Sequence, residues 1–365
     1  MKKIMISALL VSLTLLITCC AKGSSSDNNS KVGVETVSLS SLSQESDKYN
    51  AALHSLSLDN ISIPDELTVS FPKDTGIYKV KVTGDFNDKS DSIYSSLIPE
   101  EIFNSGEVTL DESITPYGPT FYDEKSGMRL DIGENGFVSF TLGRITETEE
   151  TENDRKLIKE DTAASKAAAE FEDRLDKAAH YDSGVKPFLS LEYPNGDTQI
   201  VLQPTFNDIP IESIGNEYPD REDLGKAFEN VFAMKYNWCK VNASGEVSEF
   251  IRQCAFNEYE TEEKYESIIT PECAARLVSE KLSASMSLEI KGMGIVYLPF
   301  YVENKSVQKR ITDQVDSGAK NIYWADNIIR LVPYWEIYFD LTENAEQYAL
   351  VDAKTGEVFY INNAE

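Results

Sequence analysis

Two stretches decide the fold: VNASGEV at residues 241–247 and VDAKTGEV at residues 351–358. Each predicts the end of a strand, a tight turn around Gly245 or Gly356, and the start of a second strand. Strand-forming residues flank both turns, at 236–241 and 247–251 in the first case and at 348–351 and 358–361 in the second. We therefore expect two hairpins that end two similar units, about 110 residues apart.

A helical pattern precedes each hairpin. Half of residues 154–179 are charged, and apolar residues recur among them at helical spacing: Leu157, Ala164, Ala168, Phe171, Leu175 and Ala178. Before the second hairpin, Thr270 is a favourable N-cap, Pro271 suits the first helical position and Glu272 favours the helix dipole. The apolar face of that second helix consists of Ala274, Leu277, Val278 and Leu282. Each helix is expected to pack its apolar face on a core.

Strand-like segments lie between helix and hairpin in both units, at 199–203 in the first and at 294–302 and 328–339 in the second. A helix with one apolar face, followed by antiparallel strands, predicts a helical layer on a sheet. The expected fold class is therefore α+β, with two tandem helix-on-antiparallel-sheet units at residues 154–260 and 268–362.

The second unit resembles a PepSY-type module. The resemblance rests on Ile269-Thr270-Pro271-Glu272-Cys273-Ala274, on Pro333-Tyr334-Trp335-Glu336-Ile337, and on the hairpin at 352–358. In the first unit, residues 207–211 are similar to the Gly-Ile-Pro-Val element of related propeptide modules. The resemblance implies non-catalytic modules of exported Gram-positive proteins that bind or restrain other envelope proteins. The whole chain is similar to uncharacterised lipoproteins of that envelope.

Residues 49–146 are expected to form a separate β-rich N-terminal domain. Residues 78–82 alternate between apolar and polar side chains, and 128–132 face 137–142 across a turn that contains Asn135 and Gly136. The charged run 147–154 is the expected linker to the first unit.

The first residues predict an export signal. Lys2 and Lys3 precede an apolar run at 4–17, which is shorter than the roughly twenty residues of a spanning helix. The run ends in Thr18-Cys19-Cys20, which resembles a bacterial lipobox. We expect a signal peptide at 1–20 with the lipid on Cys20; Cys19 is an alternative, and an ordinary cleaved signal is another. The Ser-rich stretch 21–48 is expected to be a flexible tether.

Three further cysteines remain: Cys239, Cys254 and Cys273. The predicted hairpin pairs Cys239 with Glu249, which leaves Cys254 about five residues away, too far for a disulfide at about 3.3 Å per residue. A Cys254–Cys273 bond has no positive support, so buried free thiols are expected. The spacing indicates no zinc site.

The formal charge of −28 disfavours nucleic acid and anionic lipid as partners, because both require clustered Lys and Arg. Only two histidines occur, His54 near the tether and His180 at a helix end, and no nucleophile, phosphate-loop or dinucleotide motif accompanies them. We therefore expect no enzymatic activity, no cofactor and no metal site.

Aromatic residues provide the candidate binding surface: Tyr334, Trp335, Tyr338, Trp324 and Tyr301 in the second unit, and Trp238 in the first. Neighbours on a strand face opposite sides, so some of them point away from the core of their unit. That second face either packs on the other unit or forms an exposed patch.

The expected function is that of a membrane-anchored extracytoplasmic lipoprotein, held by an N-terminal lipid at the cell membrane. It would act as a non-enzymatic protein-binding or regulatory module with an envelope protein as its partner. A solute- or glycan-binding lipoprotein is the alternative, and a hydrolase that uses acidic residues is a third hypothesis.

Overall fold

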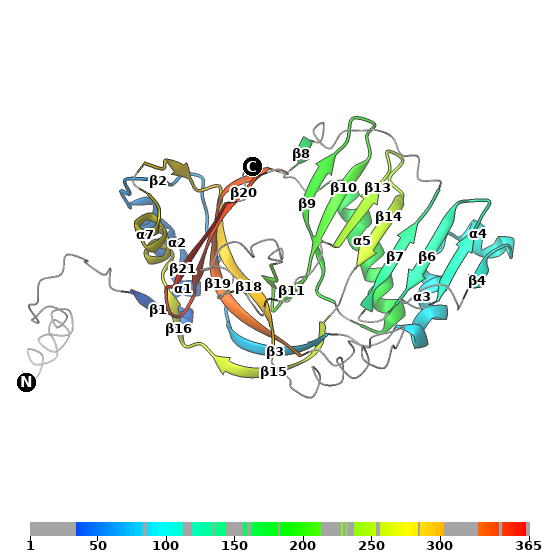
Figure 1. The fold of residues 1–365 in the computed structure, drawn as a ribbon, viewed down its shortest axis with the longest axis horizontal. Coiled ribbons are helices and arrows are strands. Elements are labelled where there is room, and N and C mark those ends of the chain that lie inside the picture. Colours follow the sequence, from blue (N-terminus) through cyan, green and yellow to red (C-terminus); the bar gives the residue numbers. More distant parts are fainter. Residues whose placement is uncertain are drawn as a thin grey trace, which may run out of the picture. The chain divides into compact units, whose positions relative to one another are not determined.

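The computed structural model describes residues 34–82, 86–111, 119–133, 136–143, 156–158, 162–181, 183–212, 228, 231, 237–252, 256–283, 285–302, 328–342 and 345–362. Two large antiparallel sheets dominate this part of the chain (Figure 1). The predicted signal peptide, Cys19, Cys20 and Trp324 lie outside the described residues.

The first sheet has nine strands, and every neighbouring pair is antiparallel. In spatial order they are β4 (Thr109–Asp111), β5 (Thr120–Asp123), β6 (Met128–Ile132), β7 (Val138–Thr141), β14 (Val247–Arg252), β13 (Asn237–Val241), β10 (Thr198–Gln203), β9 (Lys186–Glu192) and β8 (Lys156–Ile158). Helix α5 (Ala163–Ala179) packs on one face of this sheet, against β13, β9, β10 and β14. Two shorter helices accompany it, α3 (Ser90–Leu97), which contacts α5, and α4 (Glu100–Ser105).

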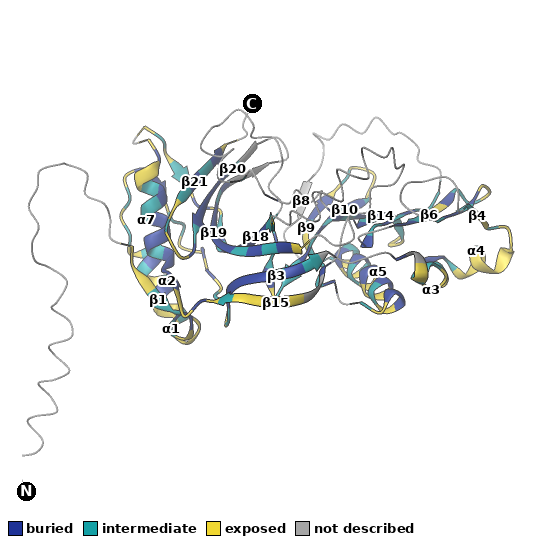
Figure 2. Cartoon of the chain, turned by 60° about the horizontal axis from the view of Figure 1, so that its bottom comes forward, coloured by how far each residue is buried: buried dark blue, intermediate teal, exposed yellow. Residues whose placement is uncertain are grey.

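The second sheet has six strands: β15 (Phe256–Lys264), β3 (Gly76–Val82), β19 (Ile328–Thr342), β20 (Ala345–Asp352) and β21 (Val358–Asn362), with β18 (Gly292–Tyr301) paired to β19. Helix α7 (Pro271–Lys281) contacts β19, β20 and β21, and α2 (Ser46–His54) contacts α7. Figure 2 shows buried residues on one side of α7 and exposed residues on the other.

Short paired strands complete the description. They are β1 (Thr36–Ser38) with β16 (Ser267–Ile269), β2 (Ile61–Ser62) with β17 (Leu288–Glu289), and β11 (Thr205–Phe206) with β12 (Ile209–Pro210). Helix α1 (Leu39–Gln44) follows β1 directly, and its Leu39 and Leu42 are buried. Residues 36–48 of the predicted tether therefore lie in β1, α1 and the start of α2, and Leu39 and Leu42 belong to the core.

The two hairpins of the repeated stretches are confirmed as β13–β14 and β20–β21. Their turn glycines, Gly245 and Gly356, have φ values of 88° and 76°, which glycine adopts without steric cost. A bulge after Lys240 shifts the first hairpin by one residue, so Cys239 faces Phe250 and not Glu249. Cys239 and Cys273 are buried and form no disulfide among the described residues, and Cys254 lies outside them.

Both predicted helices are present. The Thr270 side chain accepts a hydrogen bond from the Cys273 amide at 3.3 Å, and Pro271 is the first residue of α7. The first helix begins later than its apolar pattern suggests, because Thr162 and Ser165 form a capping box. Residues 156–158 before it form strand β8.

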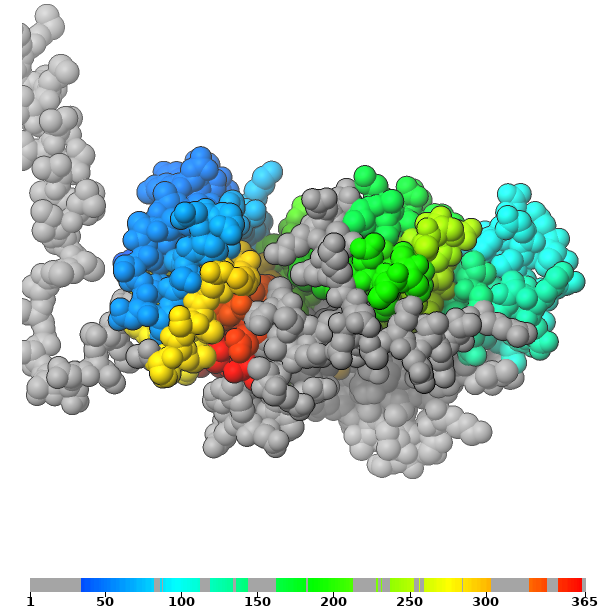
Figure 3. Space-filling model, turned by 90° about the horizontal axis from the view of Figure 1, so that it is seen from above, coloured from blue at the N-terminus to red at the C-terminus, as the bar shows by residue number. Residues whose placement is uncertain are grey.

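The expected fold class is wrong. Strands dominate the chain, and they form two large sheets in place of an N-terminal domain followed by two helix-on-sheet, PepSY-like units. Strand β3 of the expected N-terminal domain pairs with β15 and β19, whereas β7 of the same domain pairs with β14. Figure 3 shows the first described residues, in blue, beside later parts of the chain in yellow to red. Strand patterns predict local structure, and pairing across long sequence separations depends on tertiary packing.

Candidate functional site

The face of the nine-stranded sheet opposite α5 carries a row of apolar side chains. Cys239 and Val241 of β13 belong to the core that includes Phe171 of α5. Because side chains alternate along a strand, Trp238 and Lys240 point to the other face. Trp238 is half-buried there.

Strand register places three more apolar residues beside Trp238. Val201 of β10 lies opposite both Trp238 and Leu189, and Ile251 of β14 lies opposite Trp238. All four side chains are half-buried. At about 4.8 Å between strands, this Trp238 row (Leu189, Val201, Trp238 and Ile251) extends about 14 Å across the sheet.

Polar and charged side chains border the Trp238 row. The adjacent row holds Gln199, Lys240, Glu249 and Thr141, each opposite the next. Lys240 lies 3.4 Å from a carboxylate oxygen of Asp197, and its ammonium sits 5.1 Å from the Tyr193 ring centroid. Further along the face, Arg129 pairs with Asp131 at 2.8 Å. Paired charges of both signs therefore lie along one side of the apolar row, within a chain whose formal charge is −28.

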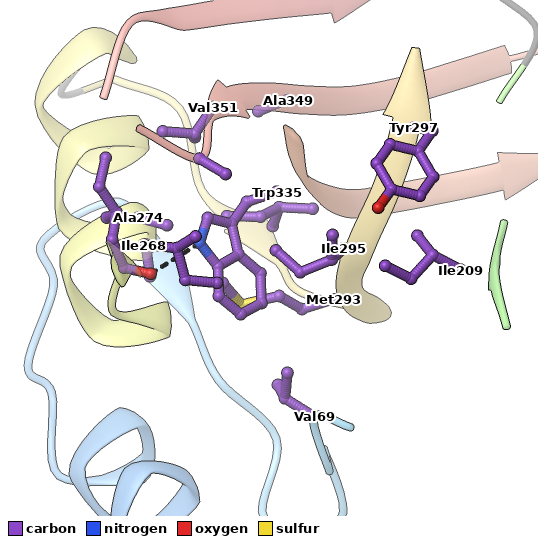
Figure 4. Close-up of a cluster of buried hydrophobic side chains, with 14 of the residues drawn as sticks. Val69, Ile209, Ile268, Ala274, Met293, Ile295, Tyr297, Trp335, Ala349 and Val351 are labelled. Atoms are coloured by element: carbon purple, nitrogen blue, oxygen red, sulfur yellow. Dashed lines mark hydrogen bonds between the residues drawn. The ribbon is translucent and has the colours of Figure 1, made fainter. Parts of the chain in front are cut away.

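Trp335, the central residue of the predicted surface, is a core residue. It is 0% exposed, and its indole Nε1 donates a hydrogen bond of 2.9 Å to the Ile269 carbonyl oxygen (Figure 4). Its neighbours in the cluster come from α7, β18 and β20 and include Ala274, Ile295 and Val351. Trp335 therefore holds α7 and the sheet together and is not accessible to a partner.

Tyr334 and Tyr338 point to the opposite face of the six-stranded sheet. They share an apolar cluster with Phe228, Val231 and Tyr348, and Tyr334 is 8% exposed. Burial raises the pKa of Tyr338 well above its usual range, and the nearby carboxylates of Glu212 and Glu336 add to the rise. Other residues of this cluster therefore cover the face of the sheet that carries Tyr334 and Tyr338.

Tyr301 and Trp238 are the two remaining residues of the predicted surface that the structure describes. Tyr301, the last residue of β18, is 39% exposed and lies apart from Trp238, which belongs to the other sheet. The structure therefore does not bring the predicted residues into one surface. The sequence contained part of the signal for the Trp238 row, because Val201, Trp238 and Ile251 lie on predicted strands. Whether their side chains share one face depends on the strand register, which the sequence pattern does not show.

A buried ionic cluster lies on the α5 side of the same sheet, and sequence reasoning missed it. Arg252, the last residue of β14, is fully buried and contacts Glu172 at 2.5 Å and Asp176 at 2.8 Å. Ser183 is buried beside both carboxylates. Glu172 and Asp176 are four residues apart on α5, so an i, i+4 acidic pair next to the apolar stripe was the available signal.

The described residues include no group of three or more His, Cys, Asp or Glu side chains placed to hold a metal ion. His54 Nε2 lies 2.9 Å from the Leu67 carbonyl oxygen, and His180 is the C-cap of α5 with a φ of 53°. Burial raises the pKa of the Cys239 thiol, so this cysteine is not poised as a nucleophile. Within the described part of the chain, no helix is both long and apolar enough to cross a membrane.

No family model matches this chain, and no curated protein matches it. Among solved structures, it is similar to the crystal structure of an uncharacterized protein from Eubacterium rectale. The two are 12% identical with a TM-score of 0.52, and the match covers 87% of this chain and 99% of the other. At this identity the likeness shows a shared fold alone.

Proposed function

We propose that this protein is a lipid-anchored extracytoplasmic lipoprotein that works as a non-enzymatic protein-binding module of the cell envelope. The lipobox-like Thr18-Cys19-Cys20 after the apolar run supports the anchor. The Trp238 row supports the binding role, and it is the single observation on which that role rests. The partner is an envelope protein.

The composition of this face fits a protein partner. Protein interfaces combine an apolar centre with a polar rim, and Trp, Tyr and Arg contribute most of the binding energy. The Trp238 row supplies the centre, and Gln199, Lys240 and Glu249 form part of the rim. An antiparallel sheet presents these side chains on a rigid backbone, so little conformational entropy is lost when a partner docks.

Capture from the envelope tests this proposal. The bait is the chain from Val34 to Glu365, because β1 and α1 belong to the core. Solubilised envelope of the producing organism is passed over the immobilised bait, and retained proteins are identified by mass spectrometry. The Trp238→Ala variant is the test. Tyr259→Ala is the matched control, because Tyr259 is 63% exposed and belongs to the six-stranded sheet.

The proposal predicts an envelope protein that the wild type and Tyr259→Ala retain and that Trp238→Ala loses. Identical retention by all three baits would place the binding site elsewhere. Retention of no protein, combined with a shift in melting temperature on addition of a soluble glycan, would replace the protein partner by a glycan.

A further inference from the structure

The ionic cluster around Arg252 contains one cation and two acids in a buried place. The Arg252 guanidinium donates from Nη1 to Glu172 Oε1 and Asp176 Oδ1, and from Nε to the Gly136 carbonyl oxygen at 3.3 Å. Its Cζ atom lies over the Phe86 ring, 5.4 Å from the ring centroid. The Arg252 side chain is 0% exposed, that of Glu172 4% and that of Asp176 15%. Arginine stays protonated in proteins, so the guanidinium carries a full charge.

The hydrogen bonds of Ser183 show that the cluster lacks a proton when both acids are ionised. Ser183 Oγ lies 3.0 Å from Glu172 Oε1 and 2.8 Å from Asp176 Oδ2, and it accepts from the Val185 amide at 3.2 Å. A serine hydroxyl has one hydrogen, so it can form a full, well-aligned hydrogen bond with only one of these oxygens. With two carboxylates, the other contact would join two oxygen atoms that have no hydrogen between them. A proton on one of the two acids removes this conflict.

The charges lead to the same result. Two carboxylates beside one guanidinium leave a net negative charge in the core, which burial disfavours strongly. Among the described residues, the other titratable groups that face the cluster do not balance this charge. The Cys239 thiol of β13 is neutral, since burial raises its pKa, and the phenol of Tyr181, whose ring contacts Phe86, carries no positive charge.

Glu172 is the acid that burial favours as the protonated one. Its side chain is less exposed than that of Asp176, and its Oε2 atom has no hydrogen-bond partner among the described residues. A charged oxygen without a donor is costlier to bury than a neutral one. Burial also raises the pKa of Glu172, and Arg252 offsets this rise only in part.

We infer that Glu172 holds a proton in the folded protein at neutral pH, which makes the cluster with Asp176, Ser183 and Arg252 a pH-sensitive lock between α5 and β14. As the pH rises, Glu172 loses this proton, and the buried cluster then carries an unbalanced negative charge. Glu172 binds its proton more tightly in the folded than in the unfolded chain. Its contribution to stability is therefore complete below the unfolded pKa and is lost as the pH rises through the folded pKa.

Two amide variants test this inference by urea unfolding between about pH 5 and about pH 9. Glu172→Gln resembles the protonated acid, so it should match or exceed the wild type in urea midpoint at the high end. The urea midpoint of the wild type should fall as the pH rises, with a slope that corresponds to up to about one proton per chain, and Glu172→Gln should lack this fall. Asp176→Asn removes the carboxylate that remains beside Arg252 while Glu172 holds its proton, so its midpoint should be lower than that of the wild type at the low end of this range.

The inference is overturned if Glu172→Gln lowers the midpoint near pH 6 as much as Asp176→Asn does. If either variant fails to fold, the side-chain carboxyl carbon of Glu172 in the wild type is titrated by NMR. A signal in the protonated position at pH 7 supports the inference, and an ionised signal at pH 7 overturns it.

Discussion

Trp335 and Trp238 are both strand residues with opposite surroundings. Trp335 is fully buried, and its indole donates a hydrogen bond to the carbonyl oxygen of Ile269. This bond links the six-stranded sheet to β16, the strand that precedes α7. Trp238 lies on the nine-stranded sheet, on the face opposite α5, and is half-buried. One residue type therefore serves packing in one sheet and is proposed to serve recognition in the other.

The two tryptophans should respond differently to truncation. Trp335→Ala leaves a cavity and an unpaired carbonyl, so it should lower the free energy of unfolding by about 3–5 kcal/mol. Trp238→Ala should cost about 1 kcal/mol or less, because the side chain is already partly in water. Urea unfolding of both variants measures this, and equal losses would contradict the assignment of Trp238 to an accessible face.

At the element scale, the repeated hairpins share a turn but differ in what surrounds it. A Cβ at Gly245 would meet nothing within 4 Å, whereas one at Gly356 would lie 3.0 Å from Leu277 and 3.1 Å from Ile269. Both glycines have positive φ. The β20–β21 turn is therefore packed against α7 and β16, and the β13–β14 turn is open.

Alanine at the two turn glycines separates backbone strain from packing. Gly245→Ala should cost about 1–2 kcal/mol, which is the price of a left-handed conformation for an L residue. Gly356→Ala should cost more, because Leu277 and Ile269 must also shift. Thermal unfolding of the two variants provides the comparison. A smaller loss at Gly356 than at Gly245 would show that the β20–β21 turn is not packed on α7.

Local elements could be predicted from sequence, and their partners could not. The Gly turns, the Thr270 cap and the β6–β7 pairing depend on residues that are close together in the sequence, so their patterns are visible in the chain. By contrast, β3 lies between β15 and β19, which are far away in sequence, and nothing local to residues 76–82 specifies that pairing. The bulge after Lys240 and the Arg252 cluster are likewise products of tertiary packing.

The candidate site, too, could be predicted from the sequence only in part. Aromatic residues at strand positions could be recognised, and strand alternation predicted two faces. Which face is covered depends on distant residues, since Phe228 and Val231 pack against the side that carries Tyr334 and Tyr338. Trp238 was predicted as a candidate, but its companions Leu189, Val201 and Ile251 became apparent only through register.

At the scale of the whole molecule, the proposed lipid at the N-terminus would attach an acidic chain to a membrane. A formal charge of −28 disfavours binding to anionic lipid surfaces, so the proposed attachment depends on the covalent lipid. The first described strand, β1, begins at Thr36, 16 residues after Cys20 in the sequence.

Replacement of both Cys19 and Cys20 by Ala should release the protein from the membrane, because no thiol then remains at the lipobox to carry diacylglycerol. Fractionation of cells that produce the wild type and the double variant measures this. Each single variant identifies which cysteine carries the lipid. Membrane retention of the double variant would contradict the lipid anchor.

The affinity of the captured partner tests the central claim most directly. The dissociation constant is measured for the wild-type chain, for Trp238→Ala and for Tyr259→Ala at the same ionic strength. The account predicts at least about a tenfold weaker affinity for Trp238→Ala, as for a tryptophan at the centre of an interface, and an unchanged value for Tyr259→Ala. Equal dissociation constants for the wild type and Trp238→Ala would contradict binding through this face of the nine-stranded sheet.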